Sequence, residues 1–159
     1  MAQLYCVDTS SLIKLKDFER DVFKSVWDVV EELIRTGQMF APHEVHRELR
    51  VGDDDIHKWA KQQSGLFVDL DDEQAAALRE LESRFSAVAD PLRTGPHADP
   101  MVVPLALCRS RANRATPLHV VTEERARGPG PTKIPNICQA YGLSCTNLVG
   151  VFRLEGRVF

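Results

Sequence analysis

The chain has 159 residues, of which 43% are hydrophobic and 7% aromatic, and its formal net charge is −3. This length predicts a single domain, residues 1–159, with a mainly aliphatic core. No apolar run approaches the roughly 20 residues of a membrane helix, and the first residues lack the charged start and apolar stretch of a signal peptide. We therefore expect a cytoplasmic protein with no membrane partner.

The acidic balance, with a sequence pI of about 5.9, argues mildly against a nonspecific nucleic-acid binder. Such proteins usually carry a positive excess, because neutralising phosphates supplies much of their affinity. A nuclease that holds divalent cations needs a concentrated acidic pocket, which lowers the pI and still permits local basic patches. The charge therefore does not exclude RNA or DNA as a partner.

Taken in chain order, short apolar runs alternate with segments of helical spacing. The predicted strands are residues 4–7, 38–41, 118–121 and 144–146, and residues 66–70 are predicted to be a strand or an extended connector. The predicted helices are residues 23–35, a helix from Pro42, one around residues 56–60, residues 73–89, a helix from Asp99 to about Arg111, residues 134–141 and residues 147–154. This alternation predicts an α/β fold, a three-layer α/β/α sandwich with a central, mostly parallel sheet.

Acidic residues follow two of the predicted strands. Asp8 ends the first strand, and Glu123 and Glu124 follow the fourth. In open parallel sheets, ligands bind at the carboxyl ends of the strands, near the point where the strand order reverses. Because the first strand of such a fold is usually central, Asp8 should face that crevice. Glu48 and Asp99, on predicted helices, could reach the same place.

Carboxylates gathered from four places cannot all ionise side by side without a compensating cation. Mg²⁺ and Mn²⁺ prefer oxygen ligands and can orient and activate water against a phosphodiester. We expect Ser10 or Thr122 to hold a carboxylate or a metal-bound water. Each acid also has a plainer interpretation: Asp8 and Asp99 as helix caps, Glu48 as a solvated helix residue, and the two later glutamates as loop charges.

Four motifs in the same order resemble those of PIN-domain nucleases and span nearly the whole chain. They are V-D-T-S-S-L-I at residues 7–13, P-H-E-V-H-R-E-L at 42–49, H-A-D-P-M-V-V-P-L-A at 97–106 and V-V-T-E-E at 120–124. The resemblance implies a PIN-like fold with Asp8, Glu48, Asp99 and Glu124 as catalytic metal ligands for Mg²⁺ or Mn²⁺. The family's usual fourth motif is T-x-D, so Glu124 holds the acid position and Glu123 competes for it.

The tail, with K-I-P-N-I-C at residues 133–138, resembles a prokaryotic PIN-like subgroup. That similarity implies a ribonuclease toxin of a toxin–antitoxin pair. The candidate partners are then an RNA substrate, a cognate antitoxin protein and a second copy of the chain. Arg125, Arg127 and Lys133, beside Glu124, are the candidate phosphate-binding residues.

The expected function is therefore metal-dependent endoribonuclease activity. A non-catalytic PIN-like scaffold and a structure-specific DNA nuclease stay open, although all four acid positions are acidic and the chain is short for the extra elements of such a DNA nuclease. A haloacid-dehalogenase-like phosphatase is disfavoured, because Ser10 stands where that class needs a second aspartate.

Other polar and aromatic residues are interpreted structurally. His43 and His46 are too closely spaced for the H-E-x-x-H pattern and should lie on a helix surface. Asp53 to Asp55 should start a helix, and Trp59 should be core. The four cysteines, Cys6, Cys108, Cys138 and Cys145, lack zinc-site spacing and should be small buried hydrophobes.

Overall fold

The computed structural model describes residues 2–85, 99–125 and 133–159. The strands are β1 (Leu4–Val7), β2 (Met39–Pro42), β3 (Phe67–Val68), β4 (Leu118–Val121) and β5 (Ser144–Thr146). The helices are α1 (Thr9–Lys14), the 3-10 helix η1 (Leu15–Asp17), α2 (Lys24–Arg35), α3 (His43–Gly52), α4 (Asp54–Lys61), α5 (Asp72–Arg84), α6 (Asp99–Ala112), α7 (Ile134–Tyr141) and α8 (Leu148–Leu154).

The strands form one parallel sheet in the order β3-β2-β1-β4-β5. Tyr5 of β1 lies opposite Met39 on one side and His119 on the other, so β1 is central, as predicted. The chain adds β2 and β3 on one side of β1 and then crosses to add β4 and β5 on the other. The strand order therefore reverses between β1 and β4, which is where ligands bind in folds of this class.

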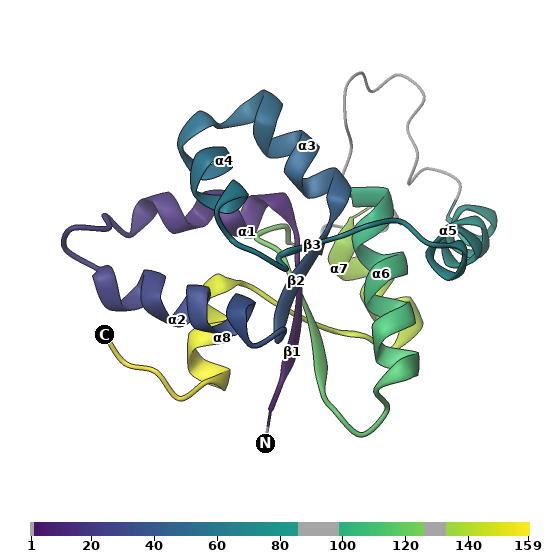
Figure 1. The fold of residues 1–159 in the computed structure, drawn as a ribbon. Coiled ribbons are helices and arrows are strands. Elements are labelled where there is room, and N and C mark those ends of the chain that lie inside the picture. Colours follow the sequence, from purple (N-terminus) through teal and green to yellow (C-terminus); the bar gives the residue numbers. More distant parts are fainter. Residues whose placement is uncertain (1, 86–98, 126–132) are drawn as a thin grey trace.

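Helices cover both faces of the sheet, which confirms the predicted three-layer α/β/α architecture (Figure 1). Helices α2 and α8 lie on one face and α5, α6 and α7 on the other, while α1, α3 and α4 lie above the carboxyl ends of the strands. Neighbouring residues of β1 contact the two layers in turn. The Tyr5 hydroxyl donates to Glu155 after α8, and the Cys6 thiol donates to the Val102 carbonyl of α6.

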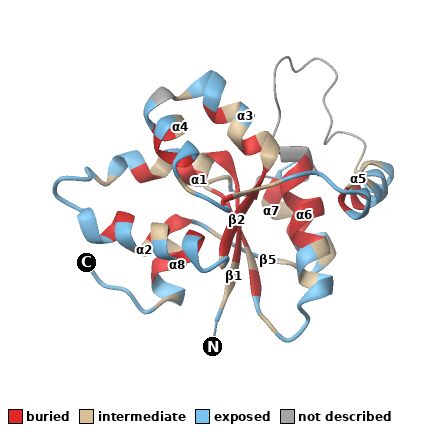
Figure 2. Cartoon of the chain, viewed as in Figure 1, coloured by how far each residue is buried: buried red, intermediate tan, exposed pale blue. Residues whose placement is uncertain are grey.

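Buried side chains concentrate along the sheet and the helix faces turned toward it (Figure 2). Trp59 is 7% exposed and packs edge-on against Trp27 with ring centroids 5.3 Å apart, so the core assignment of Trp59 is confirmed. Asp53 caps α4 by accepting from the Ile56 amide, which confirms that the acidic run starts a helix. Within the described residues, no helix is long and apolar enough to cross a membrane.

Element boundaries differ from the predictions at a few ends. Phe23 and Pro42 are the N-cap residues of α2 and α3 and lie outside these helices. Helix α5 ends at Arg84, earlier than the predicted residue 89, and residues 86–89 lie outside the described part. Pro104 lies inside α6, in its second turn, where its missing amide removes one hydrogen bond of the helix.

Candidate active site

Asp8 follows β1 and is 2% exposed. Its backbone is extended and forms the N-cap position of α1, but within the described residues its side chain makes no cap hydrogen bond to that helix. Instead, its Oδ2 atom accepts from the Ser10 hydroxyl at 2.8 Å and from the Thr122 hydroxyl at 2.9 Å. Both hydroxyls were predicted from the sequence as candidates to hold a carboxylate. The Asp8 carboxylate is therefore held between Ser10 of its own helix α1 and Thr122 at the end of β4.

The same two hydroxyls bind the chain that leaves β4. The Ser10 and Thr122 oxygens lie 3.3 Å apart. Ser10 accepts from the Glu123 amide at 3.0 Å, and Thr122 accepts from the Glu124 amide at 3.1 Å. Each hydroxyl thus donates to the Asp8 carboxylate and accepts a backbone amide. This network fixes the ends of β1 and β4 relative to each other at the point where the strand order reverses.

Glu123 and Glu124 turn to the first residues of two different helices. Glu123 Oε2 accepts from the Ser11 hydroxyl at 2.7 Å and from the Leu148 amide of α8 at 3.0 Å. Glu124 Oε2 accepts from the Ile134 amide of α7 at 3.0 Å. A carboxylate is stabilised at a helix N-terminus by the free amides and the helix dipole. Both glutamates therefore position helices around the site, a role that the sequence did not indicate.

Asp99 is the first residue of α6, and its side chain is outside the described part of the structure. Three residues further along α6, the Val102 carbonyl accepts from the Cys6 thiol of β1 at 3.5 Å. Since a helix rises about 1.5 Å per residue, the Asp99 backbone lies about 4.5 Å along the helix from that contact. The start of α6 is therefore close to the carboxyl end of β1, where Asp8 lies.

Glu48 lies in the middle of α3 and is partly buried. Helix α3 begins where β2 ends and packs against α1, the helix that follows Asp8. Three of the four predicted ligands thus come from segments next to the end of β1. Among the described side chains, no three His, Cys, Asp or Glu groups are close enough together to hold a metal ion.

A pocket of about 470 Å³ opens beside the β4 end. The residues that line it are Thr122, Glu123, Glu124, Arg125, Pro135, Cys145, Thr146, Asn147, Gly150 and Arg153. Lys133 joins Glu123, Glu124 and Arg125 around an adjoining hollow of about 430 Å³. Arg125 and Lys133 are therefore placed where an anionic ligand could reach them, whereas Arg127 lies outside the described residues.

Cys145 contradicts the interpretation of the cysteines as buried hydrophobes. Cys6 and Cys138 are buried, Cys108 is partly buried, and Cys145 is exposed on the three-residue edge strand β5. A hydrogen bond from Cys138 lowers the pKa of the Cys145 thiol against the opposing effects of burial, Glu124 and Asp8. That bond and burial raise the pKa of Cys138. The sequence carried no signal for this exposed thiol beside the acids.

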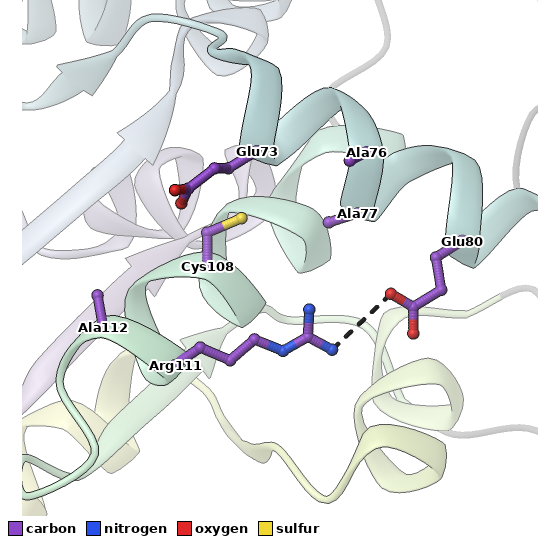
Figure 3. A pocket seen from close by; sticks show the side chains of 7 residues that line it. All are labelled: Glu73, Ala76, Ala77, Glu80, Cys108, Arg111 and Ala112. Carbon is purple, nitrogen blue, oxygen red and sulfur yellow. Dashed lines mark ion pairs between the residues drawn. The ribbon is translucent and has the colours of Figure 1, made fainter.

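A second pocket, of about 490 Å³, lies between α5 and α6 (Figure 3). Arg111 and Glu80 form an ion pair at 3.8 Å on its wall, and Cys108 points into it from α6. Its other lining residues are mostly alanines. It contains none of the predicted ligands and none of the residues that line the pocket at the end of β4.

The fold and the site together define an α/β protein with a parallel sheet and a buried, hydroxyl-bound aspartate at the point where its strand order reverses. The chain belongs to the family described as a domain of unknown function, DUF4411, whose model matches residues 5–159. No curated protein sequence matches the chain.

Proposed function

We propose that this protein is a metal-dependent endoribonuclease of the PIN-like class, acting in the cytoplasm as the toxin of a toxin–antitoxin pair. The observation that carries the proposal is the burial and hydrogen bonding of the Asp8 carboxylate. This aspartate is buried, its side chain accepts no backbone amide of α1 as a helix cap would, and its Oδ2 atom is held by the hydroxyls of Ser10 in α1 and Thr122 after β4. Such an arrangement supports a functional carboxylate at the ligand-binding edge of the fold.

The chemistry of the nearby donors fits a hard divalent cation. Asp8, Glu48 and Asp99 offer carboxylate oxygens, and Ser10 and Thr122 offer hydroxyls, so the set is made of oxygen atoms, which Mg²⁺ and Mn²⁺ prefer. Asp8, Glu48 and Asp99 would hold the ion. Glu124 binds the Ile134 amide through Oε2, so it would contribute its other carboxylate oxygen to the ion. A bound ion would supply charge neutralisation at the phosphate and activation of water.

The chain's own groups would position the substrate around this centre. The Ser10 and Thr122 hydroxyls keep Oδ2 of Asp8 in one orientation, so its other oxygen keeps a fixed direction as well. Arg125 and Lys133, at the hollow beside Glu124, would bind backbone phosphates of the RNA. These cations would attract a polyanion to one edge of a chain whose net charge is negative.

A second candidate function is a non-catalytic scaffold for a protein partner. The observation in its favour is that Glu123 and Glu124 both accept helix amides, as structural carboxylates do. A scaffold of this kind would bind its partner without a metal and without cleaving RNA. The two proposals therefore differ in whether the protein cleaves RNA when a divalent cation is present.

The test is cleavage of a fluorophore-labelled RNA of mixed sequence by the purified protein with Mn²⁺, with Mg²⁺ and with EDTA. The wild type should cleave only with a divalent cation, and Asp8→Asn should lose at least a hundredfold in rate. Asp28→Asn is the matched control, because Asp28 is an exposed aspartate on α2 that pairs with Lys24. It should cleave at the wild-type rate.

Equal activity of Asp8→Asn, or unchanged cleavage in EDTA, would contradict the mechanism. Absence of cleavage under every condition would favour the scaffold, and preference for a branched DNA over RNA would favour a DNA nuclease. Glu123→Gln and Glu124→Gln distinguish the fourth acid, since glutamine still accepts an amide hydrogen bond but carries no charge. The glutamate that is a ligand should lose activity, and the one that only positions a helix should keep it.

A further inference from the structure

Two histidines from different helices face each other above the sheet. His46 lies on α3 and His57 on α4, and their Nε2 atoms are 3.1 Å apart. Their ring centroids are 4.8 Å apart with an angle of 30° between the planes. Both side chains are partly buried, so the rings are held in place and still reachable from solvent.

The two Nε2 atoms are within hydrogen-bond distance of each other, and they are also close enough to bind one ion together. A centroid lies about 1.15 Å from Nε2, so rings pointing straight at each other would have centroids about 5.4 Å apart, well beyond the observed value. A single ion about 2.05 Å from both nitrogens, on the axes of their lone pairs, would subtend about 98° and separate the centroids by about 4.8 Å. The observed separation, 4.8 Å, agrees with convergent lone pairs and excludes only a straight, head-on hydrogen bond.

We propose that His46 and His57 form a binding site for a borderline transition-metal ion such as Zn²⁺, which joins α3 to α4. Imidazole nitrogen suits Zn²⁺, Ni²⁺ and Cu²⁺ and does not suit Mg²⁺ or Mn²⁺. Two protein ligands leave further coordination positions for water or a ligand from solution. The site is thus an open one, and its affinity is moderate compared with that of a closed four-ligand zinc centre.

The neighbouring groups agree with a two-histidine site. His43 lies with its ring centroid 5.6 Å from that of His46, but its Nδ1 atom faces Asp69 at 3.7 Å. Burial is the largest cause that lowers the pKa of His46, followed by the nearby cationic or ionisable groups His57, His43, Arg50 and Lys61. Arg50 and Lys61 would repel a cation and lower its affinity, so an ion here would be held by directed bonds to the two imidazole nitrogens and not by charge.

This site is separate from the acidic one and does not depend on the proposed nuclease function. His46 and Glu48 are two residues apart on α3, which places them about 200° apart around the helix. The histidine faces α4 and the ring of Phe67, whose centroid is 4.8 Å from its own. A metal between His46 and His57 would fix the position of α3 without contacting Glu48.

The experiment is calorimetric titration of the full chain with Zn²⁺ in the presence of excess Mg²⁺, which occupies sites that prefer oxygen ligands. The wild type should bind one equivalent of Zn²⁺. His46→Gln and His57→Gln should each weaken this binding at least tenfold, while the control variants His43→Gln and Asp8→Asn should change it less than twofold. Far-ultraviolet circular dichroism of each variant checks that it is folded before the titration.

A second measurement uses the wild type alone and so does not depend on how the variants fold. Of the five histidines in the chain, two should show side-chain ¹⁵N shifts typical of metal-bound imidazole when one equivalent of Zn²⁺ is added. The proposal is overturned if no histidine shifts, or if His57→Gln binds Zn²⁺ as the wild type does. It is also overturned if His43→Gln or Asp8→Asn loses the binding to the same extent as His57→Gln.

Discussion

Replacing Thr122 by valine keeps the shape of a side chain that is 2% exposed and removes its hydroxyl. That hydroxyl donates to the Asp8 carboxylate at 2.9 Å and accepts from the Glu124 amide at 3.1 Å. The first bond is to a charged group and contributes about 1.5–3 kcal/mol, and the second contributes about 1 kcal/mol. Allowing for the more favourable burial of a methyl group, we expect Thr122→Val to lower the free energy of unfolding by about 2–4 kcal/mol.

The assay is urea unfolding followed by circular dichroism, with the slope of the transition checked for constancy between variants. In thermal unfolding the same change corresponds to a decrease in Tm of roughly 4–16 °C for a domain of this size. Thr116→Val is the matched control, because the Thr116 hydroxyl makes no hydrogen bond within the described residues and the residue lies in the loop before β4. Its effect should stay within about 0.5 kcal/mol.

Ser10 supplies the other hydroxyl that donates to Asp8, so replacing it tests the rest of the hydrogen-bond network. Ser10→Ala removes the other donor to Asp8 Oδ2 and the acceptor of the Glu123 amide. Because the two hydroxyls share one carboxylate oxygen, the double variant should differ from the sum of the single ones by about 0.5–3 kcal/mol. Additive effects, or a cost of Thr122→Val no larger than that of Thr116→Val, would refute the idea that these hydroxyls fix Asp8 across the strands.

Three further predictions concern the surrounding structure. Asp53→Ala should lower the free energy of unfolding by about 1 kcal/mol through loss of the α4 cap, while Asp53→Asn keeps the cap. The hydrogen bond from Lys16 lowers the pKa of Asp53. The wild type should therefore be more stable to unfolding than Asp53→Asn above about pH 3.8, and this difference should disappear as the pH falls through the lowered pKa. Urea unfolding of both proteins between pH 2 and 7 checks this. Cys145 should be the thiol that iodoacetamide alkylates first, at a rate that rises with pH, as followed by peptide mass spectrometry; faster labelling of another cysteine would contradict it. Gly150→Ala should destabilise the protein by about 1–3 kcal/mol, because the new methyl group would collide with Thr146. Gly52→Ala has open space around it and should stabilise the protein by up to about 1 kcal/mol. Thermal unfolding of both variants measures these changes.

The sequence predicted the sheet well because the strands are short apolar runs with polar or turn-forming neighbours. Residues 4–7, 118–121 and 144–146 are strands with the predicted boundaries. The order of the strands is set by tertiary packing, which no local pattern encodes, so only the central place of β1 could be expected, from the fold class. Helix ends were less certain because Phe23 and Pro42 suit either a cap or a first turn.

The site was predictable in its location and less so in its contacts. A parallel sheet brings strand ends to one edge, so Asp8 and Thr122 were expected at the same edge, and their direct contact follows from the pairing of β1 with β4. The direction of a glutamate side chain depends on which helix begins beside it, and this is decided by the folded chain. The exposure of Cys145 was missed for a similar reason, because its strand is short and lies at the sheet edge.

The positions of the two glutamates limit how the proposed nuclease can be assembled. If Glu124 became a metal ligand through Oε2, the Ile134 amide would lose its acceptor, at a cost of about 1–3 kcal/mol where the amide is buried. A metal or substrate would have to bind the rearranged state more tightly by at least that amount, since a ligand shifts an equilibrium only by its difference in affinity. An arrangement that needs no such rearrangement keeps Oε2 of Glu124 on the Ile134 amide, so that Asp8, Glu48 and Asp99 hold the ion and Glu124 adds at most its Oε1 atom. On this reasoning Glu124→Gln retains much of the activity, and Asp8→Asn does not.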